Sequence, residues 1–243
     1  MRTTKGLLAV AATALALMGF APSAIAATDG VVRDVTPNGI IPANTELHAV
    51  GWANFTSVIP GGSFNCHVTA IIKMTGTEGK TGDITVFKRL EPFACTFIFP
   101  FNGCTLTASS ADNLPWHVTV TPPSGTTAGD LDVTPHEESL PIRITNTFSG
   151  ALCPIAGTSS ITASGLTLSP LKTGTSAVTN TSGRLTAGTI GTAGVNDPIA
   201  GFELSGSAFL DKPNEGGSEE VRITGELELT SATHRCTWKI AAS

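Results

Sequence analysis

Histidine side chains are the most versatile chemical groups in this sequence, and their spacing predicts no catalytic or metal site. His136-Glu137-Glu138 begins like the helix of a zinc protease, but Leu140 stands where the second histidine ligand would be needed. His67 and His117 each lie on the polar side of an alternating segment, and they could share a metal only if their strands were neighbours. The sequence also lacks the Gly-x-Ser-x-Gly elbow of many serine hydrolases. We therefore expect no catalytic, cofactor-binding or metal residues.

Acidic residues gather in two places, 130–132 and 211–220. The second stretch could be a calcium loop, but Pro213 occupies the third position, where an EF-hand requires Asp or Asn. A hairpin turn is the better interpretation. A carboxylate pair for glycoside hydrolysis stays open, because such a pair is defined by spatial separation and not by sequence spacing.

The five cysteines predict two disulfides, since exported proteins oxidise their thiols. None of them forms a Cys-x-x-Cys motif of the zinc or redox type. The sequence leaves many connectivities open. Among them we expect Cys66–Cys104 and Cys153–Cys236, with Cys95 as the odd cysteine, either free or paired between chains.

Alternation of apolar and polar residues dominates the chain and predicts β-strands, because successive side chains of a strand point to opposite faces. The pattern is clear at 66–73, 116–120, 140–145, 221–229 and 236–240. Turns rich in Gly and Pro separate these segments, and no stretch after residue 27 has a helical apolar stripe. We expect an all-β fold, an antiparallel sandwich or barrel with disulfides.

The three tryptophans, Trp52, Trp116 and Trp238, lie on the more apolar side of their segments, so we expect them in the core rather than at a sugar-binding surface. A stretch rich in Pro and Gly at 122–135 could divide the domain 27–243 into halves, 27–121 and 136–243. Residues 156–195, rich in Gly, Ser and Thr, could form flat strands or a long loop.

The first 26 residues have the features of a cleavable signal peptide. Arg2 and Lys5 precede an uncharged apolar run, and Ala24 and Ala26 flank the expected cleavage site before Ala27. The run is too short to cross a bilayer, and we expect no membrane span in the mature chain. Cleavage would leave 12 of the 14 basic residues against 19 acidic ones, a net charge of −7 that disfavours nucleic acid as a partner.

The segment from Cys104 to Leu114-Pro115-Trp116-His117-Val118 resembles small secreted bacterial all-β surface proteins of the alkane-oxidation-activator type. In these a cysteine precedes a strand that starts Leu-Pro-Trp-x-Val. This chain differs in its extra cysteine and longer C-terminal half. The resemblance implies an exported, non-catalytic protein and supplies no catalytic residues.

Composition, the odd cysteine and this resemblance together lead to one expected function. We expect a secreted or cell-surface protein, part of the surface or the extracellular matrix, that is adhesive or self-associating. Its partners would be itself or cell-surface components. One alternative is a secreted module that binds a carbohydrate or a small apolar ligand. The other is an extracellular hydrolase with an unrecognised site.

Overall fold

β-Strands make up nearly all the regular structure of this chain. The computed structural model describes residues 30–34, 39–58, 62–76, 79–89, 95–172, 178–179, 185–186, 191–213, 216–230 and 238–242. Within these residues there are 17 strands and one short 3-10 helix. The expected all-β class is therefore confirmed. The expected signal peptide, residues 1–26, lies outside the described residues.

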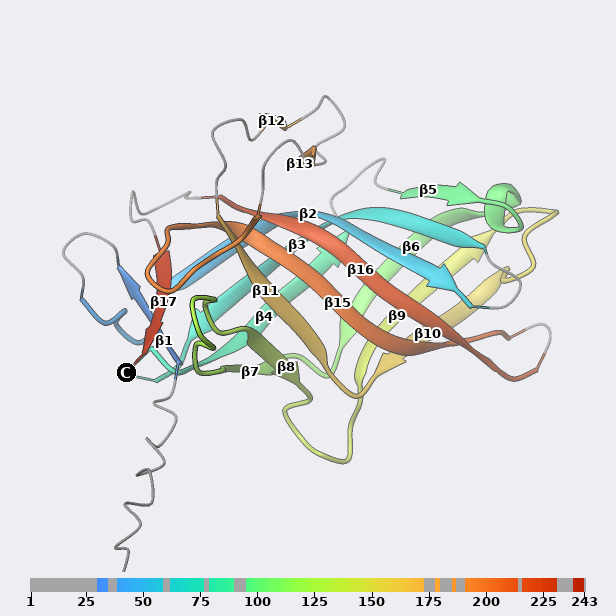
Figure 1. Cartoon of the computed structure of the whole chain (residues 1–243). Coiled ribbons are helices and arrows are strands. Elements are labelled where there is room, and N and C mark those ends of the chain that lie inside the picture. Colours follow the sequence, from blue (N-terminus) through green and yellow to red (C-terminus); the bar gives the residue numbers. More distant parts are fainter. Residues whose placement is uncertain are drawn as a thin grey trace, which may run out of the picture.

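The strands follow one another closely along the chain (Figure 1). The first nine are β1 (Gly30–Asp34), β2 (Glu46–Ser57), β3 (Ser63–Met74), β4 (Thr81–Arg89), β5 (Cys95–Ile98), β6 (Thr105–Asp112), β7 (Trp116–Val120), β8 (Leu131–Thr134) and β9 (Ile142–Ser149), with helix η1 (Phe101–Gly103) between β5 and β6. The others are β10 (Gly157–Ala163), β11 (Leu166–Lys172), β12 (Val178–Thr179), β13 (Leu185–Thr186), β14 (Gly191–Thr192), β15 (Ile199–Asp211), β16 (Ser218–Thr230) and β17 (Trp238–Ala242).

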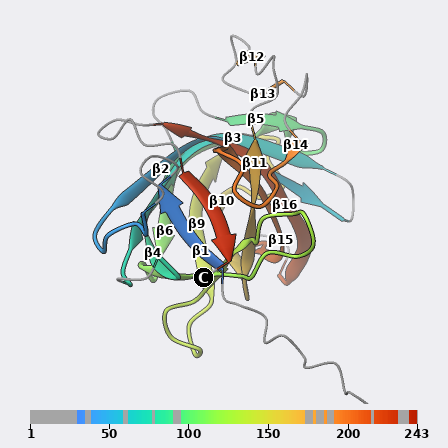
Figure 2. The same cartoon turned by 60° about the vertical axis from the view of Figure 1, so that its left-hand side comes forward.

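Eight strands close into an antiparallel barrel. The hydrogen-bonded order is β2, β3, β4, β7, β8, β11, β15 and β16, and β16 pairs with β2 again. Strands on both sides of 122–135 belong to this ring, and β8 itself lies inside that stretch. The barrel is elongated (Figure 1), and β1 and β17 lie side by side at the end that faces the viewer in Figure 2.

Several positions of the barrel are filled by two strands placed end to end. β10 and β11 both pair with β15, one after the other, with Ala163 opposite Ala208 and Thr167 opposite Ser205. β10 continues the sheet through β9 to β6. On the side of β6 next to β4, the Arg89 guanidinium donates a hydrogen bond of 2.8 Å to the Leu106 carbonyl. The barrel therefore extends beyond its hydrogen-bonded ring.

The core lies inside the barrel and follows the alternation predicted from the sequence. In β3 the buried side chains include Phe64, Val68, Ile72 and Met74, while their neighbours in the strand are mostly half-buried on the outer face. The Phe64 ring packs within 4.8 to 6.3 Å of four other phenylalanine rings. Burial of such a side chain stabilises the fold by roughly 1.5–3 kcal/mol.

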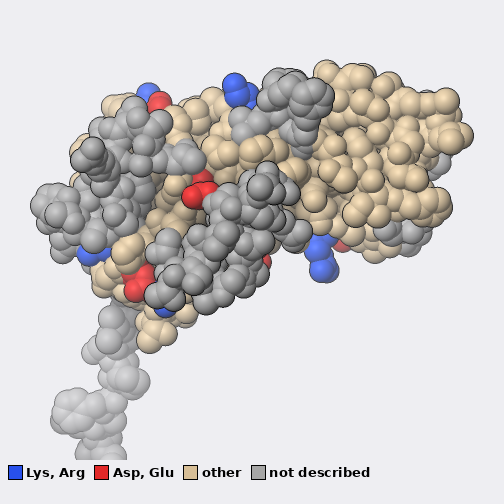
Figure 3. All heavy atoms as spheres, turned by 90° about the horizontal axis from the view of Figure 1, so that it is seen from above, with Lys and Arg blue, Asp and Glu red and all other residues tan. Residues whose placement is uncertain are grey.

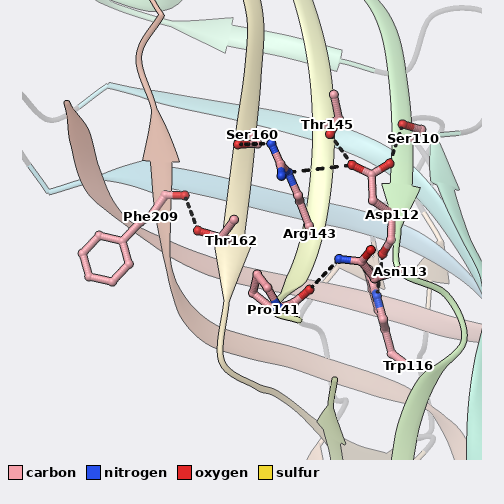
Figure 4. A network of polar contacts seen from close by, with 10 residues as sticks. All are labelled: Ser110, Asp112, Asn113, Trp116, Pro141, Arg143, Thr145, Ser160, Thr162 and Phe209. Atoms are coloured by element: carbon pink, nitrogen blue, oxygen red, sulfur yellow. Dashed lines mark hydrogen bonds and ion pairs between the residues drawn. The ribbon is translucent and has the colours of Figure 1, made fainter. Parts of the chain in front are cut away.

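Trp116 is fully buried, as expected, and a polar network anchors it where β6 passes into β7 (Figure 4). Its indole N–H donates to the Asp112 carbonyl at 3.0 Å. The hydroxyls of Ser110 and Thr145 donate to the Asp112 carboxylate, and Arg143 lies 3.9 Å from it. The network joins β6, β7 and β9 and orders the junction around Trp116.

The two disulfides are Cys66–Cys95 and Cys104–Cys153. The expected pairs Cys66–Cys104 and Cys153–Cys236 are therefore wrong, and Cys95 is not the odd cysteine. β5 continues along the edge of β3, which places Cys95 directly opposite Cys66 in the ladder. Cys104 precedes β6 and Cys153 lies in the β9–β10 turn, beside it. The remaining cysteine, Cys236, lies outside the described residues.

Other segments singled out in the sequence can be located in the structure. The alternating segment 116–120 is β7, and the acidic stretch 211–220 forms the β15–β16 hairpin, with Asp211 opposite Ser218. Gly216 and Gly217 have φ angles of 63° and 123°, which glycine adopts readily. Of residues 156–195, which could form flat strands or a long loop, 157–163 and 166–172 form β10 and β11, whereas 173–177, 180–184 and 187–190 lie outside the described residues. In the described part of the chain, no helix has the length and apolar character needed to cross a bilayer.

Candidate ligand-binding groove

The candidate metal and nucleophile residues are not brought together. Four cysteines form disulfides, and β4 separates the strands of His67 and His117. His117 instead lies 3.1 Å from the Asp83 carboxylate. The described residues contain no group of three or more His, Cys, Asp or Glu that could hold a metal ion.

A groove on the outer face of the barrel gathers polar side chains around a tryptophan. It has a volume of about 260 Å³ and lies over β15, β16, β2 and β3. One row of directly opposite residues runs from Glu203 through Glu226 and Trp52, which line the groove, to His67, which lies beside Trp52. Because opposite residues on neighbouring strands have Cβ atoms about 5 Å apart, the row brings the four side chains into one site.

A second row runs parallel to the first, two residues along each strand. It contains Ser205, Thr224, Asn54 and Asn65. The Asn65 side-chain oxygen is buried and accepts no hydrogen bond from the described residues. The Asn54 amide donates to the Thr56 hydroxyl at 3.3 Å. The second row therefore adds amide and hydroxyl groups to the carboxylates and rings of the first.

Glycines under the groove let the strands approach closely. A Cβ atom on Gly225 would lie 2.2 Å from the Trp52 carbonyl oxygen, and one on Gly51 would lie 1.9 Å from the Glu226 carbonyl oxygen. Real Cβ atoms do not come so close to a backbone oxygen, so neither position accepts a larger residue without a shift of the backbone. The glycines thereby allow the close spacing of β2 and β16, the strands that carry Trp52 and Glu226.

The two rings of the first row contact each other. The centroids of Trp52 and His67 are 5.3 Å apart and their planes are inclined by 33°. Burial lowers the pKa of His67, because desolvation disfavours the charged imidazolium. At neutral pH the ring is therefore neutral and offers one donor and one acceptor nitrogen.

Trp52 was expected in the core, and this expectation is wrong. Its side chain is half-buried on the outer face, whereas its neighbours Gly51 and Ala53 face inward. A signal was present in the sequence, since 49, 51 and 53 are all Ala or Gly, and small residues at every second position mark a closely packed inner face. The side chain of Trp238 lies outside the described residues.

Two other cavities are less suited to a ligand. A cavity inside the barrel, next to Arg89 and Asn146, has a volume of about 20 Å³, room for roughly one water. A shallow hollow of about 520 Å³ lies beside the β8–β9 loop, near Glu138 and Ser164, and no aromatic ring lines it. The outer groove alone of these three combines an aromatic ring with amides and carboxylates.

Comparison with known proteins gives no relative from which a function could be transferred. No family model matches the chain, and no curated protein or solved structure is significantly similar to it.

Proposed function

We propose that this chain is an exported, non-catalytic surface or matrix protein that adheres to carbohydrate through the outer groove. The observation that carries the proposal is the row of Trp52 and His67 rings beside Glu226 and Glu203, with Asn54 and Asn65 alongside. A pyranose ring has an apolar face that packs on an indole and a rim of hydroxyls that need hydrogen-bond partners. The groove supplies both.

Export to an oxidising compartment is part of the proposal. Two disulfides support it, because disulfides persist outside the cytoplasm and are rare within it. The signal-peptide pattern of residues 1–26 supports it from the sequence. Location at the cell surface or in the surrounding matrix follows from the proposed adhesion to glycans.

The groove favours neutral saccharides over acidic ones. Its two rows contain the carboxylates of Glu203 and Glu226 and no lysine or arginine. Carboxylates accept hydrogen bonds from sugar hydroxyls but repel uronates and sialic acid. Neutral hexose and N-acetylhexosamine polymers are therefore the expected class.

A glycan array tests the proposal. The exported protein is compared with Trp52→Ala, and Phe209→Ala serves as the matched control, because Phe209 is an exposed aromatic residue elsewhere on β15. We expect binding to neutral glycans that Trp52→Ala abolishes and Phe209→Ala retains. Absence of glycan binding by the unaltered protein, or equal binding by Trp52→Ala, would contradict the proposal.

A second candidate function rests on the two carboxylates. Glu203 and Glu226 are directly opposite on β15 and β16, and glycoside hydrolases use a pair of carboxyl groups about 5–10 Å apart. The test is incubation of each bound oligosaccharide with the protein and with Glu226→Gln. Cleavage products that disappear with Glu226→Gln would establish hydrolase activity. An oligosaccharide that stays intact would contradict it and favour binding without catalysis.

A further inference from the structure

One end of the barrel carries large apolar side chains in contact with solvent. Phe99 is 75% exposed and Leu152 is 85% exposed, and Ile98 and Val58 are each more than half exposed. We call these four residues the apolar tip. Ile98 is the last residue of β5, and the other three lie on the β2–β3, β5–β6 and β9–β10 connections, at the right-hand end of the molecule in Figure 1.

The three connections are held against one another. A Cβ atom on Gly103 would lie 2.9 Å from the Cβ of Leu152, and one on Gly62 would lie 2.5 Å from the ring of Pro100. The Cys104–Cys153 disulfide joins the β5–β6 connection to the β9–β10 turn covalently. The three connections are therefore packed and cross-linked into one surface rather than being independent loops.

Charged residues are missing from the segments that form the tip. Residues 47–72, 95–111 and 144–171 contain no Asp, Glu, Lys or Arg. The right-hand end of the face in Figure 3 accordingly shows no blue or red atoms. A backbone contact brings one charged residue beside these segments: the Glu220 carbonyl accepts a hydrogen bond from the Val58 N–H at 3.0 Å. Insertion of the four tip side chains into an apolar medium would therefore desolvate no charged group of these three segments.

Three backbone N–H groups in the two most exposed turns are already paired. The Cys104 N–H donates to the Phe101 carbonyl at 2.8 Å. In the β9–β10 turn, the Cys153 and Ala156 N–H groups donate to the carbonyls of Gly150 and Cys153, each at 3.2 Å. Removal of water from these turns leaves those donors satisfied.

We propose that the apolar tip inserts into a lipid surface of zwitterionic headgroups. Phe99 and Leu152 project from separate turns, and a fluid acyl layer accepts projecting side chains without a complementary shape. The tip has no basic residue that would select anionic lipid, and the charged residues of β16 beside the end of β2, Glu220 and Arg222, are of opposite sign. Phosphatidylcholine is the matching headgroup chemistry.

Flotation with phosphatidylcholine vesicles tests this proposal. The exported protein is compared with the double variant Phe99→Ser/Leu152→Ser and with Leu140→Ser, which removes an exposed leucine on the β8–β9 loop, at the end of β9 away from the tip. Unchanged melting temperatures and circular dichroism spectra show that the variants fold. We expect partitioning that falls by roughly tenfold or more for each tip residue removed, because each loses the transfer of a large apolar side chain. Leu140→Ser should bind as the unaltered protein does.

Salt and oligomeric state complete the test. Binding should be unchanged between low and high ionic strength and should not require anionic lipid. Failure of the unaltered protein to bind vesicles, or equal binding by the double variant, would overturn the proposal. A dimer in light scattering that the double variant converts to monomer would also overturn it, since the tip would then be covered by a second copy. The groove variant Trp52→Ala should leave vesicle binding intact, so this test is independent of the glycan test.

Discussion

Removal of the Cys104–Cys153 disulfide should destabilise the barrel strongly, because the bridge closes a long segment of the unfolded chain. The two cysteines are 49 residues apart in sequence, and those of Cys66–Cys95 are 29 apart. Loop-closure entropy then gives about 4 kcal/mol for the first bridge and about 3.5 kcal/mol for the second. The two loops do not overlap in sequence, so the two effects should add.

Double variants measure these values. Cys104→Ala/Cys153→Ala and Cys66→Ala/Cys95→Ala are compared with the unaltered protein by urea unfolding and thermal melting. A loss of about 4 kcal/mol corresponds to a fall of roughly 8–16 °C in melting temperature for a chain of this size. Peptide mapping after alkylation should find Cys95 within a disulfide. Alkylated Cys95 in the native protein, or an unchanged melt of both double variants, would refute the reasoning.

Three further predictions concern single side chains. Trp116→Ala should lower the free energy of unfolding by about 3–5 kcal/mol, because Trp116 is fully buried, and urea unfolding measures this. His67 should titrate below its ordinary pKa of about 6.5 in an NMR pH series, since burial lowers its pKa. Stability should then fall as pH drops below about 6.5, and His67→Gln should reduce that fall, because the unfolded chain binds the proton more readily. Asp197 should titrate below its ordinary pKa, because the Gly194 N–H and Lys172 stabilise its carboxylate. Its contribution to stability is present at neutral pH and should disappear as pH falls through that lowered pKa.

The strands were predictable wherever one face is apolar and the other polar. Residues 116–120 alternate cleanly and form β7 within those bounds. The hairpin at 211–218 was predictable because glycines with positive φ follow an acidic, Pro-containing turn. The closure into a barrel was not predictable, because it depends on two pairings between strands that are not consecutive in the chain. These are the pairing of β11 with β15 and the pairing of β16 with β2.

The disulfides and the groove depended on register, which the sequence does not display. β5 has only four residues, and so short an alternating segment fits several positions along β3, so its register could not be inferred. That position decides the Cys66–Cys95 pairing. The groove depends on the register of four strands, which aligns residues as distant in sequence as Glu203 and His67. Its one sequence signal was the run of small residues around Trp52.

NMR titration of the groove tests the central claim of carbohydrate adhesion most directly. The protein is labelled with ¹⁵N and titrated with cellohexaose, chitohexaose and, as an acidic comparison, oligogalacturonate. We predict that a neutral oligosaccharide shifts the Trp52 indole N–H and the Asn65 side-chain amide in a saturable way, and that Trp52→Ala removes the Asn65 shift. The signal of the buried Trp116 indole should stay in place. Saturable shifts confined to residues outside the two rows, or no shift with any neutral saccharide, would contradict the account.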